Sequence, residues 1–464
     1  MLRNVNRRAT CGRVLAIAMG AVAAQLTGEA SAQTLEDAVR IAIGEHPTVK
    51  VAEANARAAN ETVNEKFSGW LPRLDLRAAT AQEHVNNPAT RARNARSTGD
   101  NLSGNAAGNT GGQAGVNIWS NTGTVALTHN LFNGFATIHS VDAARQRAAV
   151  SRHLVLDARD VIGLRVVEAY FSVLRARAVV QLSEANVRDH VSVYDDIRAK
   201  SDAGGGDLAD ANQALSRLEL ARERAAALQG ELRAAEIDFR EAVGSMPQEL
   251  SEPRVPTHMI PLDMQAAVDA AMVGNPAIRA AIGNVAASQA DIKEARAPYL
   301  PILDLELAAT REHGTGGVRG TSIDESAALV MRYNFFNGFA DRARRMRAIE
   351  RADGATQSEA ETRRLVEEQM RTDYNSMLTE TERVPILLRR VRAAEDVVSA
   401  YRQQFELGSR TLLDVLDVVN ELFQAKVAFV DGDTRQKIAQ YQVMATMGVL
   451  LPPMGIAPPP DKEG

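Results

Sequence analysis

The sequence predicts a mainly α-helical protein with a smaller β-sheet portion, built from two similar halves. Three observations support this fold class. The 464 residues are 45% hydrophobic but only 4% aromatic, which is typical of long helices rather than of a large mixed core. Two stretches of roughly 65 residues carry apolar residues spaced by three and four. Four shorter segments alternate apolar and polar residues, as half-buried strands do.

The first 32 residues have the pattern of a secretory signal peptide. Arginines precede an apolar stretch from Val14 to Leu26, and Ala30-Ser31-Ala32 follows as a cleavage site. We therefore expect Gln33 to begin the mature protein. The single cysteine, Cys11, lies in this leader, so we expect no disulfide, thiolate chemistry or cysteine-bound metal in the mature chain. No later segment has 18 consecutive apolar residues, the length of a membrane-spanning helix.

Composition and motifs argue against nucleic-acid binding and against catalysis. The net charge is -5 and no basic block is present. The sequence has no arrangement of nucleophile and base, no phosphate-binding loop and no histidine pair at metal-binding spacing. We therefore expect a protein that is not an enzyme, needs no cofactor and holds no metal.

Two halves of the chain resemble each other. The run Trp70–Leu76 resembles Tyr299–Leu305, and Asn130–Ala136 resembles Asn334–Ala340. These matches occur in the same order in both halves, which chance similarity does not easily produce. The sequence therefore predicts an internal duplication.

The duplication sets the expected organisation of the chain. We expect a signal peptide over 1–32, a first repeat over 33–248, a second repeat over 249–451 and a disordered proline-rich tail over 452–464. Each repeat is expected to contain a helix, two strands, a long helix and a return helix. The first repeat has extra Asn, Gly, Thr, Ser and Arg residues around 85–122, which predict a polar surface loop between its strands.

Caps and turns set the expected helix boundaries. A first helix with Thr34 as its N-cap is expected to run to about Phe67, and its counterpart to follow Pro276. The long helices are expected over about 136–201 and 340–405, and the return helices over about 207–243 and 411–448. Their apolar spacing is typical of coiled coils. Pro385 is expected to kink the second long helix or to mark a local irregularity.

The aromatic residues indicate that the four strands cross a membrane. Half of the 20 aromatic residues lie in or beside the strand segments, mostly at strand ends, as in the girdles of outer-membrane barrels. The girdle candidates are Trp70, Trp119, Phe132, Tyr299, Phe335 and Phe336. A packed soluble sheet is the alternative, but its aromatic residues should lie in mid-strand.

Four strands cannot close a membrane barrel by themselves, because about eight is the minimum. Open sheet edges are not tolerated in lipid. Several chains must therefore share one barrel, and a trimer with 12 strands is the simplest arrangement.

The order helix, strand, strand, long helix, glycine turn and return helix resembles the TolC family of outer-membrane efflux and secretion channels. The most specific match is the run from Phe405 to Asp417, with the spacing Gly-x-Arg-Thr-x-x-Asp-Val-Leu-Asp. The resemblance implies a homotrimer with a β-barrel in outer-membrane lipid and a long helical tunnel in the periplasm. It also implies a periplasmic adaptor and an inner-membrane ABC or RND transporter as partners. The implied function is export of proteins, as in type I secretion, or of small molecules, as in multidrug efflux.

The resemblance also assigns roles at the periplasmic tip, where the tunnel narrows. Asp414 and Asp417 would face the lumen and form two stacked acidic rings in a trimer, which favour cations. Arg410 matches the gating arginine of the family, and Asp210 is its expected partner. Phe405 stands where the family often has tyrosine, so one closing hydrogen bond is expected to be missing.

The turns at the tip are the expected docking surface for the adaptor. The residues concerned are Gly204, Gly205, Gly408 and Ser409. A soluble periplasmic coiled-coil adaptor is the alternative function. It would explain the leader and the helices, but not the alternating strands with aromatic residues at their ends.

Overall fold

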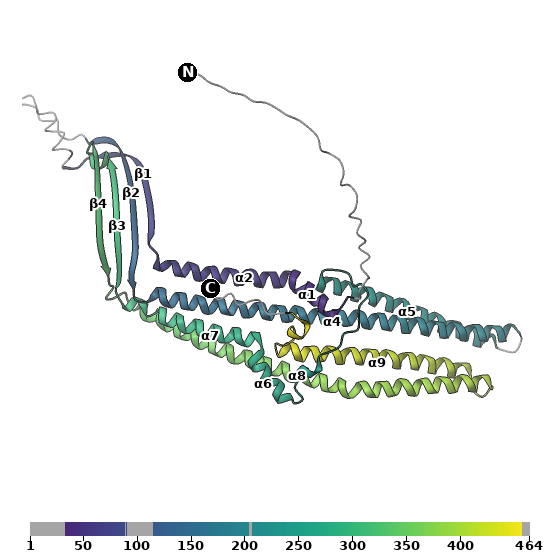
Figure 1. Ribbon diagram of the computed structural model, residues 1–464. Coiled ribbons are helices and arrows are strands. Elements are labelled where there is room, and N and C mark those ends of the chain that lie inside the picture. Colours follow the sequence, from purple (N-terminus) through teal and green to yellow (C-terminus); the bar gives the residue numbers. More distant parts are fainter. Residues whose placement is uncertain (1–32, 89, 91–114, 204–206, 457–464) are drawn as a thin grey trace, which may run out of the picture.

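The computed structural model describes residues 33–88, 90, 115–203 and 207–456, so the expected signal peptide lies outside the described residues. The described helices are long and lie side by side, and the sheet stands at one end of them (Figure 1). The first half contains α1 (Leu35–Glu45), α2 (Pro47–Phe67), β1 (Arg73–Val85), β2 (Val116–Asn133), α4 (Ala136–Asp202) and α5 (Leu208–Val243). The second half contains α6 (Met264–Gly274), α7 (Pro276–Glu294), β3 (Ile302–His313), β4 (Thr321–Arg332), α8 (Ala340–Glu406) and α9 (Leu412–Thr446). The same order of elements therefore occurs twice.

The first helix of each half is interrupted before a proline. Thr34 caps α1 as expected, but the single helix expected to reach Phe67 is wrong, because α1 ends at Glu45. His46 is extended and its Nδ1 accepts a hydrogen bond from the Thr48 amide at 3.2 Å, which starts α2 at Pro47. The residue before a proline avoids the helical region, so the chain must break there. Asn275 makes the corresponding break between α6 and α7.

The helices form one curved layer and two long hairpins. Helices α2, α4, α7 and α8 contact one another in that order. Helices α4 and α5 form the first hairpin, and α8 and α9 form the second. Both hairpins extend away from the sheet (Figure 1). Pro385 lies inside α8, which remains one helix from Ala340 to Glu406.

A tight turn joins a strand to a long helix in each half. Gly134 and Phe135 have φ of 66° and 68°, and Gly338 and Phe339 have φ of 67° and 65°. A left-handed phenylalanine is strained, and the strain recurs at the same place in both halves. A side chain on Gly134 would lie 2.4 Å from the Ala297 carbonyl, so this turn also requires a close backbone approach.

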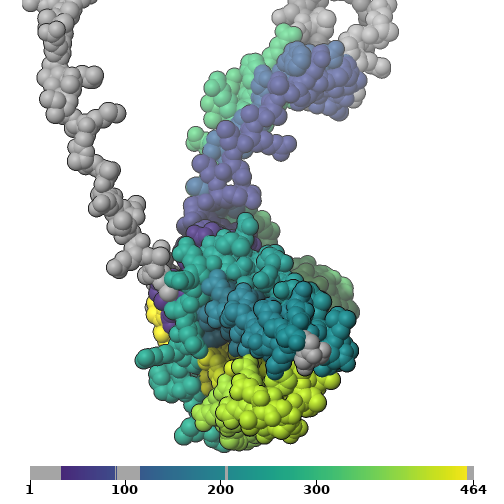
Figure 2. Space-filling view, turned by 90° about the vertical axis from the view of Figure 1, so that its right-hand side faces the viewer, coloured from purple at the N-terminus to yellow at the C-terminus, as the bar shows by residue number. Residues whose placement is uncertain are grey.

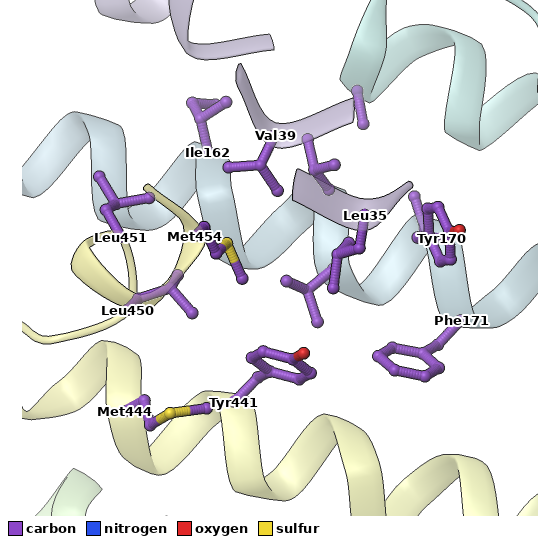
Figure 3. Close-up of a cluster of buried hydrophobic side chains, with 14 of the residues drawn as sticks. Leu35, Val39, Ile162, Tyr170, Phe171, Tyr441, Met444, Leu450, Leu451 and Met454 are labelled. Atoms are coloured by element: carbon purple, nitrogen blue, oxygen red, sulfur yellow. The ribbon is translucent and has the colours of Figure 1, made fainter. Parts of the chain in front are cut away.

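The main core lies where α1 crosses α4 and α9 (Figure 3). Tyr170 is fully buried, and its hydroxyl lies 2.8 Å from the Gln33 carbonyl and 2.6 Å from the Ser251 carbonyl. It thereby ties the start of the first half to the start of the second. Met454 also packs in this core and is only 5% exposed, after a short 3-10 helix at Pro452–Met454. The expected disorder is therefore wrong for residues 452–456, while 457–464 lie outside the described residues.

The four strands form one antiparallel sheet in the order β1-β2-β3-β4. Among the described residues, each of the outer strands β1 and β4 has one edge that no other strand pairs with. β2 begins at Val116, so the loop expected over 85–122 is shorter, and residues 116–122 pair with β1 and continue the sheet. Alternation along the paired strands gives the sheet one apolar and one polar face.

No helix among the described residues is both long enough and apolar enough to cross a membrane.

Candidate functional site

The apolar face of the sheet is exposed to solvent in the single chain. Leu74 pairs with Leu127, which pairs with Leu307, so apolar side chains run across three strands. Leu76 on the same face is 77% exposed, and Met331 of β4 is 68% exposed. An apolar face of this extent is a surface for lipid or for a partner, since single soluble chains rarely expose one.

The opposite face of the sheet carries paired charges. Asp304 is only 4% exposed, accepts a hydrogen bond from Asn130 Nδ2 at 2.7 Å and forms an ion pair with Arg332. Arg332 also lies 3.2 Å from Glu306. A sheet face whose charged side chains are paired with one another suits the water-filled interior of a barrel.

The expected girdle residues lie at the two ends of the sheet. Trp70 and Tyr299 lie in short 3-10 helices just before β1 and β3, and Phe335 and Phe336 follow β4. Phe132 lies near the same end of β2, where a bulge after Asn130 sets it opposite Leu303. Trp119 lies near the other end and pairs with Gln82. The 13 steps from Trp119 to Phe132 extend over ~43 Å along the strand, or ~30 Å vertically at a tilt of about 45°, which matches a hydrocarbon core.

The free ends of the two hairpins form the tip of the molecule and lie next to each other (Figure 2). A small apolar cluster joins them, with Ile197 from α4, Ala211 and Ala214 from α5, and Leu412 and Leu416 from α9. A second cluster lies within the second hairpin. Phe405 packs against both clusters, so this one ring connects the two hairpins.

The missing hydroxyl of Phe405 is replaced by a different contact. The Lys200 ammonium at the end of α4 lies 4.5 Å from the centre of the Phe405 ring. A cation over an aromatic face is attracted by the ring quadrupole, by about 0.5–1 kcal/mol at an exposed site. The missing closing hydrogen bond at Phe405 stays a prediction, and the sequence did not single out Lys200 as a contact of this ring.

Polar contacts also tie the two hairpins together. Together with the Lys200 contact we call them the hairpin clasp: Lys200–Phe405, Arg402–Asp189 at 2.9 Å, Arg217–Asp417 at 3.3 Å and Arg224–Asn420 at 2.9 Å. Each joins a residue of the first hairpin to one of the second. Sequence spacing did not indicate these pairs, because their members lie about 200 residues apart and only the tertiary fold brings them together.

Arg410 has partners other than the expected one. Its Nε donates to Gln404 Oε1 at 3.1 Å, and its guanidinium lies 4.4 Å from the centre of the Tyr401 ring. Among the described residues of one chain, no hydrogen bond or ion pair joins Arg410 to Asp210. The left-handed Gly408, with φ of 76°, lies between α8 and Arg410, and Arg410 folds back over α8. Pairing of Arg410 with Asp210 stays a prediction for contacts between chains.

Both acidic residues at the tip have partners within their own chain. Asp414 accepts hydrogen bonds from the Thr411 hydroxyl at 2.8 Å and the Thr411 amide at 3.0 Å, in a capping box that starts α9. These two hydrogen bonds lower the pKa of Asp414 below its usual value. Asp417 pairs with Arg217. Placement of the two carboxylates in a shared lumen stays a prediction, but neither is without a partner.

The expected docking turns are described only in part. Gly204 and Gly205 lie outside the described residues. Ser409 Oγ donates to the Gln404 carbonyl at 2.9 Å, and Gly408 is exposed beside it. The adjacent Leu407 is 83% exposed, so the second turn offers an apolar side chain at its surface.

Comparison with known proteins identifies the family of this chain. The model of the family "Outer membrane efflux protein" matches residues 38–245 and 267–449. The outer membrane efflux protein BepC of Brucella suis is 23% identical over 444 residues, covering 94% of this chain and 90% of BepC. The outer membrane protein TolC of Escherichia coli is 21% identical over 452 residues, covering 94% and 87%. A membrane protein from Pseudomonas aeruginosa has the same fold, with a TM-score of 0.75, 20% identity and coverage of 89% and 93%.

The family and BepC are both named outer membrane efflux proteins, and TolC is an outer membrane protein. The family match covers most of the chain and both halves of it. The chain therefore belongs to the outer membrane efflux protein family, and it is an outer-membrane efflux channel with a helical periplasmic tunnel, not a soluble adaptor.

Proposed function

We propose that three copies of this chain form one channel with a 12-stranded barrel in the outer membrane. The observation that carries this proposal is the sheet, whose two free edges belong to different strands and whose apolar face ends in aromatic residues. Pairing β1 of one copy with β4 of the next is a head-to-tail contact, which closes into a ring. Closure also leaves no open edge in the lipid.

The helices support the same side-by-side arrangement. Helix α8 exposes Met346, Leu378 and Ile386. These three residues lie on one side of the helix, because each residue is rotated by about 100° from the one before. Helix α5 exposes Leu208 and Leu215 on one side. Apolar stripes on the two free flanks of the chain fit contacts with neighbouring copies.

The proposed task is export through a tripartite pump. A periplasmic adaptor would dock on the turns at Gly204, Gly205, Gly408 and Ser409, and an inner-membrane ABC or RND transporter would deliver protein or small-molecule cargo. The efflux function in the names of the family and of BepC supports this role. No catalytic role is proposed.

The tip is the proposed gate of this channel. The hairpin clasp would hold it closed within each subunit. Arg410 and Asp210 would remain available for contacts between subunits, and Asp414 and Asp417 would set the charge of the narrow passage. Exposure of Arg410 at the surface of a single chain supports such contacts.

Arginine substitution at two neighbouring alanines tests the barrel. Ala78 lies on the apolar face and pairs with Gly123, whereas Ala79 lies on the polar face and pairs with Thr122. We expect Ala78→Arg to oppose membrane insertion by about 2–4 kcal/mol if it lies near the membrane midplane, and Ala79→Arg to be tolerated. The measurements are the yield of membrane-inserted trimer by native mass spectrometry and single-channel conductance in a planar bilayer.

Wild-type protein that is folded but monomeric and without channels would refute the proposed assembly. Equal yields for Ala78→Arg and Ala79→Arg would show that the apolar face does not contact lipid.

A further inference from the structure

A cavity lies in the helical layer directly below the sheet. Its volume is about 440 Å³. It is bounded by Ala136 at the start of α4, by Ser288 to Glu294 of α7 with the residues just after that helix, and by Arg344 to Arg351 of α8. Because β2 ends three residues before Ala136 and β3 begins four residues after Pro298, the cavity lies close to the end of the sheet.

Three neighbouring helices of the layer line the cavity. Helices α4 and α8 lie on opposite flanks of α7 in that layer, and residues of all three line the one cavity. In the proposed ring we place this cavity on the wall of the tunnel, where it would face the lumen.

Two arginines of the cavity are not neutralised within the chain. Arg344 pairs with Asp341 at 2.8 Å, and Asp291 pairs with Arg147 of α4. Arg347 and Arg351 lie one turn apart on α8, and neither has an ion pair with any described residue. They present two positive charges to the cavity at i, i+4 spacing.

One acidic residue of the cavity lies opposite these arginines without an ion pair of its own among the described residues. Burial, and then the neighbouring Asp291, raise the pKa of Glu294. Even with Glu294 ionised, two unpaired arginines against one carboxylate leave a net positive charge at the cavity.

The rest of the lining is small and mostly apolar. It consists of Ser288 and five apolar residues: Ala136, Ala295, Ala297, Pro298 and Ala348. Pockets of 300–1,000 Å³ with apolar walls and a few charged groups are typical of sites for drug-sized ligands. Arginine recognises carboxylate, sulfonate and phosphate groups through paired N–H donors.

We infer that this cavity is a binding site for amphiphilic organic anions, with Arg347 and Arg351 holding the acidic group and the alanine wall holding the apolar body. The placement in the lumen rests on the proposed trimer, which would contain three such sites around the tunnel. The site would make amphiphilic anions a preferred class of cargo for the upper tunnel.

The test uses three probes with the same apolar ring: naphthalene-2-sulfonate, neutral naphthalene-2-methanol and cationic naphthylmethylammonium. Binding to the detergent-purified full-length mature protein is measured by the fluorescence of the ring. We expect the sulfonate to bind at least about tenfold more tightly than either other probe. Block of single-channel current by the sulfonate, added to the barrel side, is the second measurement.

The variant Arg347→Gln with Arg351→Gln should lose about tenfold or more in sulfonate affinity and should relieve the block. The matched control is Arg389→Gln with Arg392→Gln, which removes the same charge from exposed positions lower on α8. Equal sulfonate affinity in wild type and in Arg347→Gln with Arg351→Gln would overturn the inference, as would equal binding of the neutral probe. Normal channels without sulfonate binding would overturn the site but keep the channel, whereas charge-selective binding without channels would contradict the proposed function and support the site.

Discussion

Breaking the Arg217–Asp417 pair should open the tip, because this pair joins α5 of the first hairpin to α9 of the second. The two side chains are 40% and 63% exposed and lie 3.3 Å apart. Solvent screens a pair at this exposure, so it contributes about 0.2–1 kcal/mol per copy. A trimer that opens as one unit would lose three copies, or roughly 0.6–3 kcal/mol. That corresponds to a rise of about 3- to 150-fold in the ratio of open to closed channels.

Single-channel recording of Arg217→Gln beside wild type measures this ratio. The matched control is Arg222→Gln, since Arg222 pairs with Glu219 in the same helix and not with the other hairpin. The effect should shrink in 1 M salt, where the Debye length falls to about 3 Å. A reversed pair, Arg217→Asp with Asp417→Arg, should restore the closed tip.

Two results would refute this reasoning. One is an open-to-closed ratio for Arg217→Gln that equals the ratio for Arg222→Gln. The other is an open-to-closed ratio for the reversed pair that equals the ratios of its two single variants. The reversed pair restores the attraction between the two positions, so it should close the tip again if that attraction holds it closed.

Further outcomes follow from the tip, the core and the loop. Arg410→Ala removes contacts only within the second hairpin, to Gln404 and Tyr401 of α8, so conductance should rise less than in Arg217→Gln; a larger rise would indicate pairing between subunits. Asp414→Ala removes the capping box on Thr411 and should speed amide exchange in the first turn of α9. Because the pKa of Asp414 is lowered, its stabilising effect should be present above pH 3.8 and be lost as pH falls further, so wild type and variant should exchange alike at low pH. Tyr170→Phe removes the one hydroxyl proton that the Gln33 and Ser251 carbonyls share, and should lower the free energy of unfolding by about 1–3 kcal/mol in chemical denaturation. Deleting residues 88–115 should leave the trimer intact on native gels, because Val85 and Val116 already pair at the ends of their strands.

Local chemistry allowed much of the fold to be predicted from the sequence. The long helices begin at Ala136 and Ala340 as expected. Each helix directly follows an Asn-Gly-Phe turn, which is visible in the sequence. Thr34 caps the first helix because its side-chain hydroxyl accepts a hydrogen bond from the Asp37 amide, three residues along the chain. The break at His46 was missed although its cause is local, since a histidine ring can act as an N-cap before a proline.

The strand boundaries show where local reading fails. Residues 116–122 look like part of a polar loop because they contain Asn, Ser, Thr and Gly. They extend β2 because each of them pairs with a residue of β1 in the sheet. Pairing with a neighbouring strand supplies the hydrogen bonds that composition does not reveal.

The order around Pro452 has a similar cause. Prolines predict a disordered tail, but Leu451 and Met454 bury their side chains against α4 and α1. Burial of apolar side chains stabilises the segment, and the sequence does not show which surface receives it.

By itself the sequence determined the duplicated order of elements, the four alternating strands and the glycine turn at Gly408, because periodicity, caps and turn residues act over a few residues. Only the tertiary structure decided that Lys200 meets Phe405, that Asp417 pairs with Arg217 and that Arg410 folds back on Tyr401. These contacts depend on how two hairpins about 200 residues apart in the chain are aligned by the shared core. Distances between such side chains are set by packing, which no local pattern encodes.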